Sequence, residues 1–384
     1  MGVREGPHPH GAQRREGRAR PDLQARARLS LQTLSRAELT AALAARQGLI
    51  ERSRLSPAEA IRRFAPLQAQ HPPAPYIALA ARLEGFARED LEAAITARTV
   101  VKTTIMRMTL HLAEAGDYPA FAQLAREARM RTWRKQYAHL GEADVAAELG
   151  AWLGQPRTND EIRERVGRYE GVTNEPWTPI NFARNLLPLV QLPPAGHWGD
   201  RRRPSFVVDP RPRPDPADAA RLVLARYLAA FGPASRRDAA TWAGVAQRDF
   251  TAGWERLETV AYRDERGTEL LDLPGAAIPR ADTRPPVRLL AHWDQVLLAY
   301  ADRERIFAPE VEAIKLTLSG EPSVTVDGRV AASWKLERGA GAVRLTVTPH
   351  IEIGRAARAE IRAEAERTAR FCEPDGRSFA VAGI

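Results

Sequence analysis

The apolar and polar positions of the chain divide it into groups of amphipathic helices, each followed by short extended segments. Ser35 and Ser56 stand just before two such helices, and Pro57 occupies the first helical position of the second, as is typical of helix N-termini. Apolar residues at helical spacing predict helices at 36–46, 57–67, 74–85, 89–97, 117–137, 142–153, 160–168, 179–187, 216–230, 236–243, 247–257 and 356–371.

Residues 100–112 alternate between two kinds of side chain and predict a single strand. One face would carry Ile105, Arg107, Thr109 and His111, and the other Met106, Met108, Leu110 and Leu112. The first face either offers a cation, a hydroxyl and an imidazole to a pocket or is the half-exposed face of an ordinary sheet. Further strands are predicted at 259–262, 269–273, 287–291, 322–326, 329–335 and 343–349, with Asp327-Gly328 as a hairpin turn.

Helices followed by an extended wing recur three times, although no sequence repeat of fixed period accompanies them. This order predicts a mainly α fold with β wings, of the α+β class, built from tandem winged-helix modules. The predicted division is a disordered basic tail at 1–28, winged-helix modules at 29–115, 116–210 and 211–286, and a mixed α/β cap with a β-hairpin at 287–384. The tail, with seven arginines and three acids, would either add non-specific DNA affinity or be a by-product of the start site.

The charge balance favours nucleic acid as a partner. The chain carries 57 lysine and arginine residues against 48 acidic ones, a net charge of +9. Nearly all of the cations are arginines, whose planar forks bind phosphates and stack on bases, although arginine and alanine richness also follows genome composition. Residues 186–210 are expected to form a strand–loop–strand wing with Arg201, Arg202 and Arg203 at its tip, which either contacts DNA or is a solvated loop.

Several classes of site are excluded by composition. Cys372 is the single cysteine, so disulfides, thiolate zinc sites and iron–sulfur clusters cannot form within one chain. The histidines are scattered, and we expect neither a metal nor a cofactor. No apolar run has the length of a membrane span and the N-terminus has no apolar signal core, which predicts a cytoplasmic protein that does not bind membranes.

The candidate chemistry centres on Gln68-Ala69-Gln70, which is followed by His71-Pro72-Pro73. Pro72 disfavours helical geometry at His71, so the helix that starts at Pro57 is expected to end near Gln70, with both amides converging at its last turn. Amide side chains cannot take up a proton at neutral pH, but they can hold a water molecule or a leaving group. Gln68 and Gln70 are therefore the predicted catalytic pair, acting on a substrate that is already activated.

Five motifs occur in order along residues 30–372. They are Phe64-Ala65-Pro66-Leu67-Gln68-Ala69-Gln70, Arg107-Met108-Thr109-Leu110-His111-Leu112, Phe231-Gly232-Pro233-Ala234 with Asp238 and Trp242, Trp293-Asp294 with Leu297-Leu298, and Val326-Asp327-Gly328-Arg329-Val330 with Trp334. Together they resemble the winged-helix DNA glycosylases of the alkylpurine DNA glycosylase Z type. Met108 and Tyr300 depart from the small residue and the histidine that are usual in that family.

The resemblance implies tandem winged helices around a concave, C-shaped DNA channel. It also implies a monomeric, monofunctional DNA glycosylase that excises cationic N7-alkylguanine, with N3-alkyladenine as a further substrate, from double-stranded DNA. The Gln-x-Gln motif resembles the branch that unhooks interstrand crosslinks, which would serve as self-resistance to a genotoxic natural product. The alternative is a non-catalytic winged-helix regulator that reads DNA through the helix at 179–187.

N7-alkylation turns guanine into a cationic leaving group, so no general acid is needed. Gln68 and Gln70 have only to position water and the sugar. Pocket or phosphate-gripping roles fall to Arg107, Thr109 and His111, and Asp294 is either an electrostatic support or a turn cap. The predicted DNA contacts are Arg201, Arg202, Arg203, Arg303 and Arg329.

Overall fold

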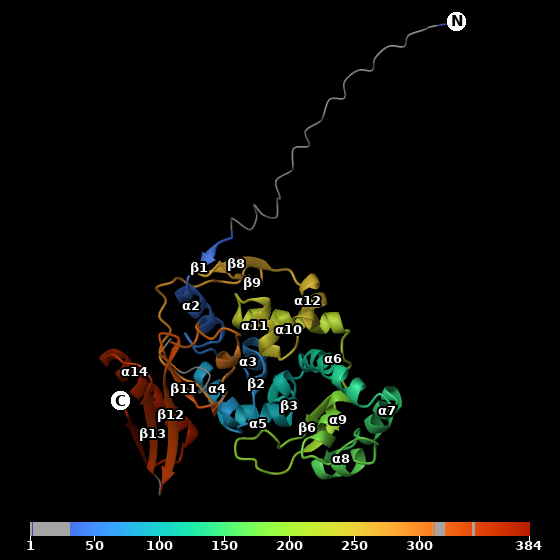
Figure 1. Cartoon of the computed structure of the whole chain (residues 1–384). Helices are drawn as coiled ribbons and strands as arrows, with labels where there is room; N and C mark the ends of the chain where they lie inside the picture. The colour runs from blue at the N-terminus through green and yellow to red at the C-terminus, as the bar shows by residue number, and fades with distance from the viewer. Residues whose placement is uncertain (1, 3–30, 309, 312–318, 340–341) are drawn as a thin grey trace. The chain divides into compact units, whose positions relative to one another are not determined.

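The computed structural model describes residues 2, 31–308, 310–311, 319–339 and 342–384. Residues 33–384 form one compact unit in which helices alternate with small sheets, so the predicted α+β class is confirmed (Figure 1). The predicted tail at 1–28 lies, apart from Gly2, outside the described residues. None of the described helices is both long enough and apolar enough to cross a membrane.

The first helices begin where their capping residues predict. Ser35 accepts from the backbone of Glu38 and Ser56 from that of Glu59, with the glutamates bonding back in both capping boxes. The helices of this part are α2 (Arg36–Arg46), α3 (Pro57–Phe64), α4 (Ala74–Arg82) and α5 (Arg88–Thr96).

Helix α3 ends three residues earlier than predicted. Its C-cap residue Ala65 has a φ of 74°, and Pro66 follows it. A residue before proline is disfavoured in helical geometry, which stops the helix before the glutamine motif. The stop signal is thus Pro66 rather than Pro72.

The next helices lie close to their predicted ranges. Thr158 forms a third capping box with Glu161 at the start of α8. The helices are α6 (Tyr118–Gln136), α7 (Glu142–Trp152), α8 (Asn159–Val166), α9 (Thr178–Leu186), α10 (Pro216–Phe231), α11 (Arg236–Ala243), the 3₁₀ turn η2 (Gln247–Phe250) and α12 (Thr251–Arg256).

One sheet joins the first two predicted modules. Its six strands have the order β2-β4-β3-β6-β7-β5, and the two wings meet where Lys102 pairs with Gln191 and Thr103 with Val190. The strands are β2 (Leu67–Gln68), β3 (Val100–Thr104), β4 (Leu110–Glu114), β5 (Arg157–Thr158), β6 (Leu189–Gln191) and β7 (Ser205–Val208). The predicted strand–loop–strand wing at 186–210 is confirmed by the antiparallel β6–β7 pair.

Two further sheets complete the unit. A three-stranded sheet pairs β1 (Thr33–Leu34) in parallel with β8 (Val260–Asp264), which is antiparallel to β9 (Glu269–Asp272). The five-stranded sheet runs through β10 (Arg288–Leu289), β11 (Ser323–Val326), β12 (Arg329–Gly339), β13 (Ala342–Pro349) and β14 (Ser378–Ala382). Helix α14 (Arg355–Cys372) packs on β13 and β14. The predicted hairpin turn at Asp327-Gly328 joins β11 to β12.

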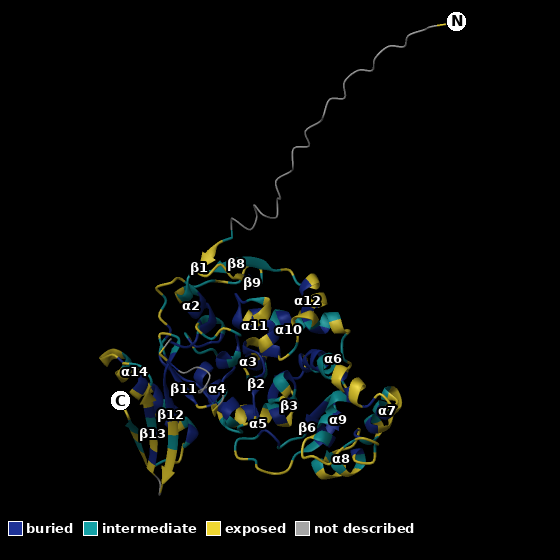
Figure 2. Ribbon diagram, viewed as in Figure 1, coloured by how far each residue is buried: buried dark blue, intermediate teal, exposed yellow. Residues whose placement is uncertain are grey.

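The largest core surrounds α10, which is dark along most of its length in Figure 2. Tyr227, Phe231 and Trp242 are fully buried there, and their rings lie 5.1–5.7 Å apart between centroids. Helix α10 contacts α2, α3, α6 and α12, so this core ties the predicted modules together. The rigid base that results carries the six-stranded sheet on which the glutamine motif lies.

Candidate active site and nucleic-acid interface

Gln68 lies on the edge strand β2 rather than at a helix end, so the predicted placement of the two amides is wrong. Its partner across the antiparallel ladder is His111 of β4. Residues that face each other in such a ladder project from the same side of the sheet, with their Cβ atoms about 5 Å apart. The structure therefore places the Gln68 amide beside the His111 imidazole.

The two glutamines act as one hydrogen-bonded unit. Side chains at i and i+2 of an extended segment share a face, and the Nε2 of Gln68 donates to the Oε1 of Gln70 over 2.9 Å. Gln68 is only 8% exposed, whereas Gln70 is exposed. The buried Oε1 of Gln68 accepts no hydrogen bond from the described residues. Gln68 thus fixes the orientation of Gln70 and keeps a free acceptor of its own.

His111 is a buried, neutral imidazole. Its Nδ1 lies 2.9 Å from the carbonyl oxygen of Thr109, and because a carbonyl only accepts, Nδ1 carries the proton and Nε2 a lone pair. Burial, together with the nearby charge of Arg107, lowers the pKa of His111 to about 3. The Nε2 atom is buried without a partner in the described part of the chain. His111 therefore presents a second free acceptor next to that of Gln68.

The predicted single strand across Thr109 is wrong, because the chain turns back on itself there. A 3₁₀ turn, η1 (Met106–Met108), separates β3 from β4, with φ of 51° at Arg107 and 58° at Met108. The guanidinium of Arg107 donates to the carbonyl of Trp242, and the Thr109 hydroxyl donates to the carbonyl of Met106 over 3.1 Å. Both side chains fasten the hairpin tip instead of lining one face with His111.

Gln70 opens into a hollow of about 640 Å³ that crosses the six-stranded sheet and reaches α8 and α9. Trp177, at the N-cap of α9, is 70% exposed, and Met108 is 41% exposed; they are the exposed large hydrophobic residues of the described chain. The other lining residues are Thr104, Leu110, Asn159, Asp160, Arg163, Ile180, Asn181, Arg184, Gln191, Arg203, Pro204 and Phe206. Apolar rings and guanidinium groups beside an exposed amide form a surface suited to bases and phosphates.

The wing arginines divide between two cavities. Arg203 lines the Gln70 hollow and pairs with Asp160. Arg202 pairs with Asp200 of its own loop over 2.6 Å, with 71% of its side chain exposed. Arg201 lines a different cavity. The loop thus reaches both sides of the glutamine segment.

The other predicted site residues lie outside the hollow. Asp294 forms a fully buried ion pair with Arg82, with 2.7 Å between Oδ1 and the guanidinium nitrogen, and caps a 3₁₀ turn, η3 (Gln295–Leu298). Arg329 donates to the carbonyls of Glu304 and Phe307. Arg303 is half-buried, and burial lowers its pKa. The structure thus shows Asp294 as the turn cap that one of the two predictions named.

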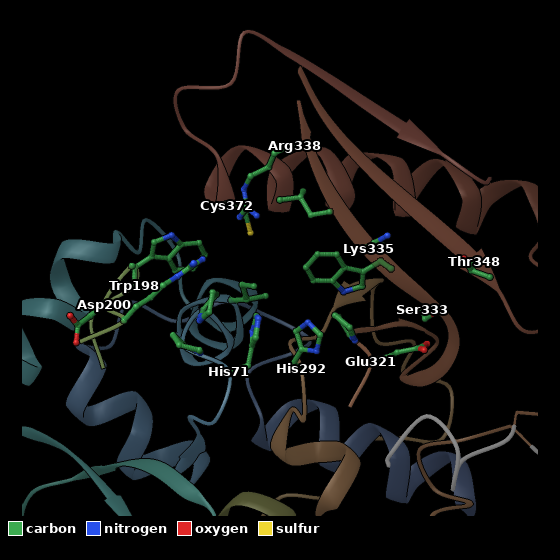
Figure 3. Close-up of a pocket in the computed structure, with 18 residues that line it drawn as sticks. His71, Trp198, Asp200, His292, Glu321, Ser333, Lys335, Arg338, Thr348 and Cys372 are labelled. Atoms are coloured by element: carbon green, nitrogen blue, oxygen red, sulfur yellow. The ribbon is translucent and has the colours of Figure 1, made fainter. Parts of the chain in front are cut away.

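The second cavity, of about 1040 Å³, begins at the residue after Gln70 (Figure 3). The rings of His71 and His292 lie 4.2 Å apart at its base. Burial, together with His292, lowers the pKa of His71 to about 4. Trp198 and Lys335 lie farther along the wall. The sequence pointed to His71 only through its place in the glutamine motif.

The described residues contain no group of three or more histidine, cysteine, aspartate or glutamate side chains placed to hold a metal ion. Cys372 is buried, and burial raises the pKa of its thiol to about 12, so it is a poor thiolate ligand at neutral pH. What the site offers is therefore amide, imidazole, guanidinium and aromatic groups.

Comparison with known proteins places this arrangement. The model of the AlkZ-like DNA glycosylase family matches residues 61–371. An interstrand DNA cross-link repair glycosylase from Streptomyces sahachiroi is 26% identical over 349 residues, which cover 85% of this chain and 93% of that protein. The solved structure of the DNA glycosylase AlkZ from the same organism superposes with a TM-score of 0.75 at 22% identity, over 91% of this chain and all of that one. The family that the five motifs predicted is thus confirmed, and the chain belongs to the AlkZ-like DNA glycosylases.

Proposed function

We propose that the protein hydrolyses the N-glycosidic bond of cationic alkylpurines, N7-alkylguanine above all and N3-alkyladenine as well, in double-stranded DNA. The observation that carries this proposal is the joined pair of Gln68 and Gln70 with His111 across the ladder. None of these three side chains is a useful proton donor at neutral pH, because amides do not ionise and the pKa of His111 is about 3. Such a site suits a base that leaves without protonation.

Bond breaking then needs little from the enzyme beyond placement. The C1′–N9 bond breaks, and its electron pair neutralises the cationic purine as it departs. A water oxygen bonds to C1′ of the sugar, which has cationic character in the transition state. The proton of that water passes to solvent, since His111 is too weak a base to retain it. The products are a free alkylpurine and an abasic site.

The two unpaired acceptors give the water a place. The Oε1 of Gln68 and the Nε2 of His111 are buried acceptors that receive no hydrogen from the described residues. A water molecule that donates one hydrogen to each would satisfy both and keep an oxygen lone pair for C1′. Gln70, whose Oε1 is held by Gln68, would orient the sugar at the mouth of the hollow.

We further propose that the enzyme unhooks interstrand crosslinks, as self-resistance to a genotoxic natural product that alkylates N7 of guanine. The relative from Streptomyces sahachiroi is named for crosslink repair, and this chain shares its length and fold. The hollow at Gln70 is open rather than enclosed by a lid of described residues, as a lesion tethered to the opposite strand requires. A crosslinked guanine cannot be turned fully out of the duplex, so an open hollow suits it better than a deep pocket.

The test is release of single lesions from matched duplexes. Oligonucleotides that carry N7-methylguanine, uracil or 8-oxoguanine at one position are incubated with the protein, and abasic sites are cleaved with alkali. We expect cleavage at N7-methylguanine alone. Efficient release of uracil would reveal an acid or base outside the glutamine pair. Tight binding without any abasic site would instead indicate a non-catalytic regulator. Conversion of a duplex bridged between two guanine N7 atoms into separable strands tests the crosslink claim.

A further inference from the structure

Two arginines beside the Gln70 hollow have no acidic partner. Arg184 of α9 lines the hollow, and its guanidinium donates only to the side chain of Asn181, over 3.3 Å. Arg129 of α6 donates to the carbonyl of Ile105. No carboxylate in the part of the chain that the structure describes pairs with either. By contrast, Arg131 on the same helix as Arg129 pairs with Asp249 at 2.8 Å.

The two charges act on each other in a poorly solvated place. Helices α6 and α9 pack together, and both arginines are half-buried. Burial, and then the charge of Arg129, lowers the pKa of Arg184 to about 10. Burial lowers the pKa of Arg129 to about 10 as well. Like charges without counter-charges in a desolvated site destabilise a fold, so a compensating anion is expected there in the working state.

This pair lies next to the proposed chemistry. Arg129 holds the carbonyl of Ile105, the residue that starts the hairpin tip carrying Met108. The charge of Arg129 also helps to lower the pKa of His111, so it acts on the imidazole beside Gln68. Arg184 and Gln70 share one hollow. An anion bound to these arginines would therefore lie a short distance from the glutamines.

We propose that Arg129 and Arg184 form a binding site for one phosphodiester of the damaged DNA strand, which anchors the lesion nucleotide in front of Gln70. Guanidinium groups bind phosphate through paired, charge-assisted hydrogen bonds, and a phosphate supplies the missing negative charge. The inference rests on the proposed function only in taking the Gln70 hollow as the place of the lesion. It transfers the phosphate contact from Arg107, whose guanidinium is bound to the carbonyl of Trp242.

Salt dependence of binding separates a phosphate site from a structural role. Equilibrium affinities for a duplex with one N7-methylguanine are measured between 50 and 300 mM KCl, roughly the range in which counterion release dominates. Arg184→Met and Arg129→Met should each weaken binding about tenfold at low salt and reduce the log–log slope by about 0.9, the value for one lost phosphate contact. Arg168→Met is the matched control, since Arg168 pairs with Glu164 on the surface, and it should change neither quantity.

Thermal unfolding gives the opposite sign for the two explanations. Removing a desolvated charge that lacks a partner should leave the Tm of Arg184→Met unchanged or raise it. A lowered Tm with an unchanged salt slope would show that the arginine only supports the fold, and would overturn the proposal.

A neutral-phosphate scan uses the wild-type protein and so does not depend on the folding of a variant. Methylphosphonate linkages replace single phosphates on either side of the lesion, one per duplex. We expect one position, within the nearest few nucleotides, to weaken wild-type binding about tenfold, the effect of one charge-assisted contact, and to have no further effect on Arg184→Met. Equal losses at every position, or losses that add to that of the variant, would contradict it. Because Gln68→Ala should keep the same position dependence, failure of the catalytic proposal would be seen separately.

Discussion

Gln68 and His111 face each other across β2 and β4, and each keeps one buried hydrogen-bond acceptor without a donor. Buried polar atoms without partners are uncommon in native proteins, and two next to each other mark a place where a third molecule belongs. For a glycosylase that third molecule is the attacking water. The pair relates a strand register to a reaction step.

The His111 acceptor can be tested by substitution. His111→Phe removes the Nε2 lone pair while keeping a ring in the core, so we expect single-turnover excision of N7-methylguanine to slow at least about tenfold with unchanged DNA affinity. His111→Gln retains an acceptor and should recover part of the rate. Equal rates for the wild type and His111→Phe would remove the imidazole from the mechanism.

The low pKa values of His71 and His111 predict how stability depends on pH. Their folded-state values of about 4 and about 3 lie below the ordinary 6.5, so between pH 6.5 and 4 the unfolded chain binds protons that the native protein does not. The free energy of unfolding should therefore fall as the pH falls through this window. Melting curves at pH 7.5, 6 and 5 test this, and His111→Gln should lose less stability than the wild type. The same pH dependence in both proteins would contradict the buried neutral ring.

Asp294 is expected to stabilise the fold rather than to act in catalysis. Asp294→Ala leaves Arg82 charged and unpaired where both side chains are fully buried, which should cost about 3–5 kcal/mol of the free energy of unfolding. Denaturant titration measures that loss. At a temperature where the variant is folded, it should excise N7-methylguanine at close to the wild-type rate. A stable variant with a slow chemical step would reverse this assignment.

Trp177 should contribute to DNA binding through stacking. Its exposed ring lies on the hollow that contains Gln70, and stacking of one base on an aromatic ring is worth about 1–3 kcal/mol. We expect Trp177→Ala to weaken binding of the lesion duplex about tenfold and Trp177→Phe to restore most of it. Trp152, which lies under Arg157 outside the hollow, supplies the control. An equal loss from Trp152→Ala would point to general destabilisation instead.

Local signals predicted much of the fold. Helix α11 has the predicted bounds because Ser235 caps its start and Gly244, with a φ of 71°, ends it. The hairpin between β11 and β12 follows from Asp327-Gly328, whose residues have positive φ values of 49° and 77°. Such residues determine backbone geometry without help from distant parts of the chain, so the sequence is enough.

The candidate site depended on contacts that local patterns do not contain. Arg107 and Met108 adopt left-handed geometry in a turn without glycine, asparagine or proline, so alternation alone suggested an unbroken strand. The pairing of Gln68 with His111 and the approach of Arg129 to Arg184 arise from strand register and helix packing. The residue types in the glutamine motif predicted the chemistry, whereas the place of the motif on an edge strand required the fold.

The most direct test of the proposed mechanism is single-turnover excision by Gln68→Ala and Gln70→Ala, with matched binding curves on a duplex carrying one N7-methylguanine. Neither amide forms an ion pair or belongs to a basic surface, so we expect affinity to stay within about threefold while the rate falls roughly 100-fold, a loss of about 2.7 kcal/mol of transition-state stabilisation. Wild-type rates in both variants, or rate losses that match losses of affinity, would contradict the catalytic role of the pair.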